Sequence, residues 1–188
     1  MKVKDFRFLT VDDQFDERHP DWSRAYEYPA IIEAVKGYFG QDNDISIHNT
    51  SCGDHGTTAP FKEELLKICS EFRQSDIVRY ADGIDFYDIS TPCDSQYDAV
   101  INVSTLEELP PAQHKLALKC LWDQVKEGGL AVFTFDYPDV DLKIVEQWCG
   151  SLCESSGTLL NGSNSKHPFQ QFSHLNVVML VVAKEKGG

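Results

Sequence analysis

The sequence lacks the features of a membrane protein and those of a nucleic-acid binder. No run approaches the ~18 apolar residues of a membrane-spanning helix, and the first residues have no apolar signal-peptide core. Basic residues are scarce: 17 Lys and Arg stand against 30 Asp and Glu, which gives a formal net charge of −13. Because phosphate-rich partners are bound mainly by basic side chains, we expect no nucleic acid and no membrane surface as partner.

The six cysteines are scattered, and none of them forms a C-x-x-C pair. Cys149 and Cys153 lie four residues apart near the end of a predicted helix, but no histidine pair completes a zinc site. We therefore expect no metal site. The cysteines are interpreted as reduced, mostly buried thiols of a cytoplasmic protein.

With 188 residues, of which 41% are hydrophobic and 25% charged, the chain has the size and composition of one globular domain. We predict a single domain, with an N-terminal extension and helix over residues 1–40 and an α/β core over 41–188. The first part is expected to hold a short strand within 2–11 and a helix over 22–39. That helix starts or restarts at Pro29 and ends at Gly40. The composition does not indicate an oligomeric state.

The segment from Ile45 to Pro60 predicts a short strand followed by a loop with two glycines, Gly53 and Gly56. Residues 61–72 then place apolar side chains on one face of a helix, and Pro60 suits its first turn. Glycines at such a junction let a ligand approach backbone amides closely. The alternative is that the two glycines simply make a tight turn.

Further apolar runs predict buried strands, and helical patterns lie between them. The strands are predicted at 76–82, 97–103, 130–135, 157–161 and 175–183, and the helices at 112–126 and 141–152. Strand and helix alternate, and the strands are apolar runs rather than alternating patterns. This favours a doubly wound, mostly parallel sheet with helices on both faces.

Polar residues gather where these strands end. They are 50–56, Asp82, 102–108 and 136–137. In doubly wound sheets, ligands bind beyond the carboxyl ends of the strands, where the strand order reverses. The sequence therefore predicts a binding site at this edge. The segment 22–28, dense in aromatic and ionisable groups, suits either a lid over that site or simple packing.

Three segments together resemble the class I S-adenosylmethionine-dependent methyltransferases. Residues 49–56 are similar to the glycine motif after the family's first strand, 97–109 to its fourth-strand motif, and 125–135 to its helix–turn–strand motif. The resemblance covers about residues 40 to 186, and the last strand pair is similar to the family's antiparallel last strand.

The sequence also departs from the family pattern. Asn49 stands where the family has an acid, Ser51 stands where it has its first glycine, and Glu107-Glu108 replaces Glu-His. Between Asp82 and Tyr97 there is little room for the usual third strand and the helix before it. His48 lies in the first strand of the core, where a hydrogen-bonded core histidine is expected.

The resemblance implies a methyltransferase-like Rossmann fold, S-adenosylmethionine as cofactor, and a small-molecule or sugar-type substrate. By position, Asp82 would hold the ribose hydroxyls, with Asp85 as the fallback. The other implied cofactor-binding residues are Ser51, Cys52, Gly53, Gly56, Ser104, Thr105 and Glu107. Candidate catalytic bases are Asp136, His55 and Glu27.

Two other functions compete with this hypothesis. One is a methyltransferase-like protein that binds a ligand or partner without transferring methyl groups, which Asn49 and Ser51 favour. The other is a nicotinamide-dependent oxidoreductase, which is disfavoured because residues 51–56 do not supply G-x-G-x-x-G.

Overall fold

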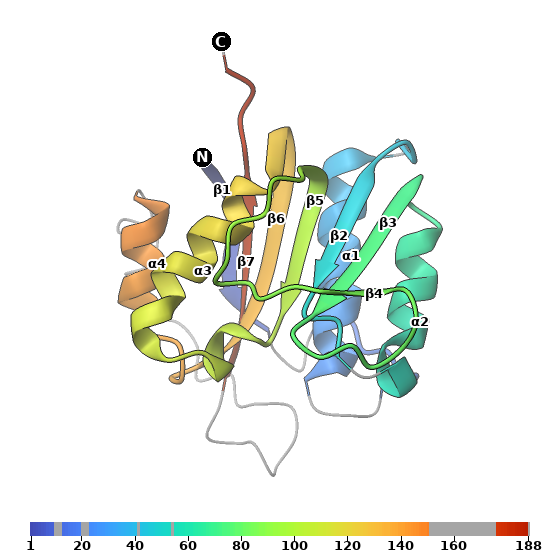
Figure 1. Ribbon diagram of the computed structural model, residues 1–188, viewed down its shortest axis with the longest axis horizontal. Coiled ribbons are helices and arrows are strands. Elements are labelled where there is room, and N and C mark those ends of the chain that lie inside the picture. Colours follow the sequence, from blue (N-terminus) through green and yellow to red (C-terminus); the bar gives the residue numbers. More distant parts are fainter. Residues whose placement is uncertain (10–12, 20–22, 41, 54, 151–175, 188) are drawn as a thin grey trace.

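The computed structural model describes residues 1–9, 13–19, 23–40, 42–53, 55–150 and 176–187, without the side chains of 55–57. These residues form one seven-stranded sheet with the order β1-β7-β6-β5-β2-β3-β4 (Figure 1). In chain order the elements are β1 Lys2–Phe8, α1 Arg24–Phe39, β2 Ser46–Thr50, α2 His55–Leu66, β3 Glu71–Asp76, β4 Ile84–Phe86, β5 Tyr97–Val103, the 3-10 turn η1 Leu106–Glu108, α3 Pro111–Asp123, β6 Val125–Tyr137, α4 Leu142–Cys149 and β7 Asn176–Ala183.

The strands from β2 to β6 are parallel, and β7 lies antiparallel between β6 and β1. From β2 the chain steps outward through β3 and β4, and then returns to place β5 on the other side of β2. The strand order therefore reverses between β2 and β5, which makes this the switch point where doubly wound sheets bind ligands. The predicted mostly parallel sheet with an antiparallel last strand is confirmed.

The helices cover both faces of the sheet, as predicted. One apolar core packs α1 and α2 against the sheet, with Ile31, Val35, Phe61 and Leu65 buried in it. The other core packs α3 and α4 on the opposite face, with Leu118, Leu121, Val145 and Cys149 among its members. A sheet covered on both faces requires strands that are apolar throughout, which explains the apolar runs of the central strands.

His48 is a structural residue of the central strand β2, as expected. Its Nδ1 lies 2.8 Å from Gln124 Oε1 and its Nε2 lies 2.8 Å from Ser75 Oγ. Burial lowers the pKa of His48 to about 4, so the ring is neutral at physiological pH. The side chain is fully buried and ties β2 to β3 and to the residue before β6.

The predicted helix over 61–72 and the predicted strand over 76–82 are wrong in their boundaries. The helix α2 ends at Leu66, and the strand β3 begins at Glu71, five residues before the prediction. Residues 71–75 pair in parallel with 46–50 of β2, and this pairing outweighs a local pattern that also fits a helix. The helix α2 also begins earlier than predicted, at His55, so Pro60 lies inside it and not in its first turn.

The other boundaries agree more closely. The strand β5 has the predicted bounds, β6 is longer than predicted at both ends, and β4 has only three residues. On α3, Leu116 is exposed, whereas Leu118 and Leu121 are buried. The predicted strand 157–161 and the predicted end of the last helix at residue 152 lie outside the described residues. In the described part of the chain, no helix is both long and apolar enough to cross a membrane.

Candidate functional site

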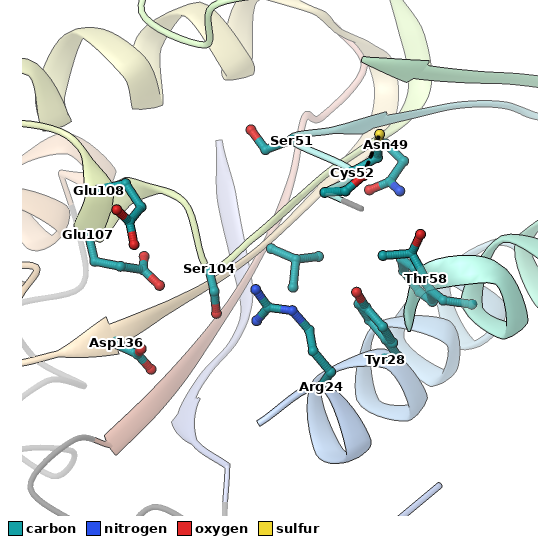
Figure 2. Close-up of a pocket in the computed structure, with 13 residues that line it drawn as sticks. Arg24, Tyr28, Asn49, Ser51, Cys52, Thr58, Ser104, Glu107, Glu108 and Asp136 are labelled. Atoms are coloured by element: carbon teal, nitrogen blue, oxygen red, sulfur yellow. Dashed lines mark hydrogen bonds between the residues drawn. The ribbon is translucent and has the colours of Figure 1, made fainter. Parts of the chain in front are cut away.

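A cavity of about 310 Å³ lies at the carboxyl ends of β2, β5 and β6, at the switch point of the sheet (Figure 2). This volume is at the lower end of the range of small-molecule sites. The cavity is lined by Arg24, Tyr28, Asn49, Ser51, Cys52, Gly53, Thr58, Phe61, Val103, Ser104, Glu107, Glu108 and Asp136.

The loop after β2 is held in place by Asp76, the last residue of β3. One carboxylate oxygen, Oδ2, accepts a hydrogen bond from Gly53 N at 2.9 Å, and the other accepts from Val78 N at 3.1 Å. Gly53 has a φ of +66°, and a Cβ added there would meet only Thr58 Cγ2, at 4.0 Å. The loop therefore needs glycine for its backbone conformation and not for space.

Two serines at the ends of neighbouring strands adopt backbone conformations with positive φ, which residues other than glycine rarely take. Ser51, after β2, has a φ of 56°, and Ser104, after β5, has a φ of 40°. The β2 end is fastened by Asn102, whose Nδ2 donates to Thr50 Oγ1 at 3.0 Å and to Ser51 Oγ at 3.2 Å. Such residues cost about 1–3 kcal/mol each and cluster at functional sites.

Glu27 of α1 is fully buried directly behind the cavity wall. Its carboxylate accepts hydrogen bonds from Ser104 Oγ at 2.6 Å, from Arg24 Nη1 at 2.6 Å and from Ser23 Oγ. Burial by itself would raise the pKa of Glu27, but the Arg24 guanidinium and the two hydroxyl donors outweigh it and lower that pKa. Glu27 is therefore an ionised anchor between α1 and β5, and it does not line the cavity.

Glu107 and Asp136 line the cavity and have the opposite electrostatic character. Burial, together with the charges of Asp136 and Glu27, raises the pKa of Glu107 to about 8. Burial and the Glu27 charge raise the pKa of Asp136 to about 7. Among the described residues, Glu107 Oε2 and Asp136 Oδ1 are buried without a hydrogen-bond partner. Both carboxyl groups can therefore change protonation near neutral pH.

The structure brings together six of the residues that the sequence singled out. Ser51, Cys52, Gly53, Ser104, Glu107 and Asp136 all line the cavity. Thr105 does not, because its Oγ1 donates to Val103 O at 2.9 Å. The candidates His55 and Gly56 begin α2, but their side-chain positions lie outside the described residues.

The prediction that Asp82, or Asp85 as the fallback, is the acid at the end of the second core strand is wrong. Because β3 ends at Asp76, Asp82 lies in the exposed turn before β4. Asp85 lies in β4 and pairs with Arg73 Nε at 2.8 Å. The acid that ends the second strand is Asp76, which is 7% exposed.

Sequence reasoning assigned no specific role at the cavity to Arg24, Tyr28 or Phe61. Tyr28 stacks on Phe61 with ring centroids 4.1 Å apart and an interplanar angle of 6°. Figure 2 shows Arg24 and Tyr28 reaching into the cavity from α1. The feature of the sequence that could have pointed to Arg24 and Tyr28 is the segment 22–28, which is dense in aromatic and ionisable groups. The structure describes this segment from residue 23 onward.

No protein-family model matches the sequence, and none of the curated proteins shows significant similarity to it. Solved structures do match. The chain is similar to the N-methyltransferase NodS from Bradyrhizobium japonicum WM9 in complex with S-adenosyl-L-homocysteine. The TM-score is 0.54 at 14% identity, covering 91% of this chain and 88% of NodS.

The chain is also similar to the magnesium protoporphyrin IX methyltransferase ChlM from Synechocystis PCC 6803 with bound S-adenosylmethionine. The TM-score is 0.55 at 13% identity, covering 83% of this chain and 78% of ChlM. An S-adenosylmethionine-dependent methyltransferase from Clostridium acetobutylicum ATCC 824 matches with a TM-score of 0.55, 12% identity, and coverage of 89% and 93%. The chain has the class I methyltransferase fold.

In this methyltransferase fold the cavity occupies the switch point between β2 and β5. The methyltransferase fold positions side chains from α1, the β2 loop, η1 and the end of β6 around one space. These segments are far apart in the sequence and meet only because the strands that carry them are neighbours in the sheet.

Proposed function

We propose that this protein is an S-adenosylmethionine-dependent methyltransferase that acts on a small-molecule or sugar-type substrate. The observation that carries the proposal is an open cavity at the switch point of a methyltransferase fold, beside the glycine loop. In a protein that had lost this activity, we would expect bulky side chains to fill the space. Solved structures of the same fold are named as methyltransferases and hold the cofactor or its demethylated product.

In this proposal the cofactor lies along the ends of β2 and β3. The backbone of residues 51–53 approaches the methionine part, and Asp76 replaces Asp82 as the acceptor for the ribose hydroxyls. A carboxylate offers about four lone-pair sites, of which Asp76 uses two for Gly53 N and Val78 N. Ile77 and Val78, exposed by 58% and 47%, offer an apolar surface for the adenine ring beside this acid.

Methyl transfer needs alignment of the sulfonium methyl with a nucleophile, and a base if the nucleophile carries a proton. Asp136 is the best of the candidate bases, because it lines the cavity and has a pKa of about 7. Glu27 is a poor base, because its lowered pKa and bound donors hold it in the ionised form.

A second function, ligand binding without methyl transfer, is favoured by one observation. Asn49 lines the cavity where the family has an acid, and its Oδ1 is buried without a partner among the described residues. If this function is correct, the protein binds the cofactor or an analogue, and the bound methyl group is not transferred to any acceptor.

Calorimetric titration with S-adenosylmethionine and S-adenosylhomocysteine tests the proposal, with NAD as the control ligand. We expect saturable binding of both adenosyl ligands at one site and no binding of NAD. Absence of binding for both adenosyl ligands would exclude the methyltransferase function. Selective binding of NAD would instead support the oxidoreductase hypothesis.

A further inference from the structure

We propose that the methyl acceptor is an amine, which enters the cavity as an ammonium ion, is bound by Glu107 and Asp136, and gives a proton to Asp136 before methylation. This inference rests on the proposed methyltransferase function and adds to it the chemical class of the acceptor. It comes from the hydrogen-bonding and charge requirements of one wall of the cavity.

That wall contains buried carboxylate oxygens for which the described part of the chain supplies no hydrogen-bond partner. Asp136 is 7% exposed and lines the cavity, and its Oδ1 has no hydrogen-bond partner among the described residues. Glu107 Oε2, on the neighbouring turn η1, is also buried without a hydrogen-bond partner among the described residues. A buried polar atom without a partner is costly, so this pair is suited to a ligand that brings donors.

The charges around the wall favour a cation. Figure 2 shows Glu107, Glu108 and Asp136 on one side of the cavity and Arg24 approaching from α1. Arg24 is already paired with Glu27, at 2.6 Å, and Asp139 adds a further acid beyond the end of β6. An ammonium group brings both a positive charge and three N–H donors, whereas a hydroxyl group brings one donor and no charge.

The proton balance of the reaction follows from these groups. An ammonium ion has no lone pair, so its proton must move to Asp136 Oδ1 before attack, which leaves a neutral amine and a protonated carboxyl group. The nitrogen lone pair then forms the N–C bond to the cofactor methyl, while the C–S bond breaks and its electron pair stays on sulfur. The products are a methylated ammonium ion and S-adenosylhomocysteine.

The surroundings of Asp136 suit this step near neutral pH. Glu27 and Arg24 from α1, Glu107 and Glu108 from η1, and Asp139 beyond β6 face it, and burial with the Glu27 charge raises the pKa of Asp136 to about 7. Asp136 must be ionised to accept the proton. The methylation rate should therefore rise as the pH rises through about 7.

The test uses matched pairs of probes that differ only in amine against hydroxyl: benzylamine with benzyl alcohol, and glucosamine with glucose. A titration with S-adenosylhomocysteine first tests the methyltransferase function by itself. Each probe is then titrated into the protein loaded with S-adenosylhomocysteine, and methyl transfer is measured with methyl-labelled S-adenosylmethionine. We expect an amine to bind saturably and to be methylated, and its alcohol partner to do neither.

Two variants separate the roles of the acids. Asp136→Asn should lower methyl transfer about 100-fold or more, since a general base contributes at least that much, with S-adenosylhomocysteine binding unchanged. Glu107→Gln should mainly raise KM for the amine. Asp94→Asn is the control, because it removes the same charge from the exposed segment before β5, and Asp94 does not line the cavity.

Several results would overturn the inference while leaving the methyltransferase function intact. These are an alcohol that binds or reacts as well as its amine, a folded Asp136→Asn variant with the wild-type rate, or binding of S-adenosylhomocysteine with no binding of either amine. If S-adenosylhomocysteine itself does not bind, the methyltransferase function fails. Titration of the amines into the unloaded protein then decides the cation site separately.

Discussion

Two pairs of carboxyl groups lie at the same edge of the sheet and differ in what their oxygens contact. Glu27 and Asp76 accept hydrogen bonds from donors supplied by the protein. Glu107 and Asp136 each keep an oxygen without a partner among the described residues. Glu27 is the most deeply buried of the four and yet has a lowered pKa, whereas the pKa values of Glu107 and Asp136 are raised. The placement of donors, and not the depth of burial, decides in which direction the pKa values of Glu27, Glu107 and Asp136 shift.

The largest expected effect comes from removing an acid whose partners are complete. Glu27→Ala leaves the partly buried Arg24 without its counter-ion and two hydroxyls without an acceptor, so it should lower the free energy of unfolding by about 3–5 kcal/mol. Urea denaturation measures this. Glu33→Ala, an exposed acid on the same helix, is the control and should change stability by less than about 0.5 kcal/mol. A loss below about 1 kcal/mol for Glu27→Ala would show that the donors find other partners.

The second prediction concerns Glu107 and Asp136, which each keep an oxygen without a partner among the described residues. Here the removal of an acid should raise the stability of the protein and not lower it. The pKa values of Asp136 and Glu107 are raised to about 7 and about 8, so between about pH 4 and these values the folded protein holds more protons than the unfolded chain. Stability from this pair is therefore present at low pH and lost as the pH rises. Asp136→Asn should make the protein more stable than wild type at pH 8, by a few kcal/mol, since each pKa unit is about 1.4 kcal/mol.

Urea denaturation of wild type and Asp136→Asn from pH 5 to pH 8 checks this. The wild-type stability should fall across the range, and the profile of the variant should be flatter. Parallel profiles for the two proteins would show that Asp136 is not buried without a partner in solution.

The third prediction compares Asp76 with Asp82 as the acid that holds the cofactor ribose. Asp76→Ala removes a charge-assisted interaction of about 1.5–3 kcal/mol. The affinity for S-adenosylhomocysteine should fall about tenfold to a hundredfold in calorimetric titration. Asp82→Ala and Asp85→Ala should bind like wild type. A loss of affinity in Asp82→Ala or Asp85→Ala, with the affinity of Asp76→Ala unchanged, would show that the ribose is held at β4 or the turn before it.

The smallest expected effect concerns the backbone of Ser51 and Ser104. Ser51→Gly relieves a φ of 56° and should raise the free energy of unfolding by the order of 1 kcal/mol. Ser51→Ala keeps the strain and should give no gain, which separates the backbone from the hydroxyl. Ser104→Gly should also give no gain, because it removes the donor to Glu27. A gain for Ser104→Gly equal to that of Ser51→Gly would mean that the Glu27 hydrogen bond contributes little. Thermal and urea denaturation measure these differences.

Sequence reasoning succeeded where a strand is apolar along its whole length. Residues 97–103 are buried on both faces of the sheet, so their apolar run fixes both strand bounds, and Asp136 and Ser104 were placed at strand ends correctly. It failed at residues 66–76, where an apolar pattern fits a helix and a strand equally well. The pairing of β3 with β2 decides between them, and it moves the strand-ending acid from Asp82 to Asp76.

The sequence by itself determined the alternation of strands and helices, the apolar runs that a doubly covered sheet requires, and the presence of polar residues at the strand ends. The tertiary structure alone decided which of those polar residues meet, because neighbourhood in the sheet depends on strand order and not on distance along the chain. It also decided their protonation. Glu27 gains donors from Ser104 and Arg24, whereas Asp136, buried at the same edge, keeps an oxygen without a partner among the described residues. That difference arises from contacts between α1, β5 and β6, which local sequence does not encode.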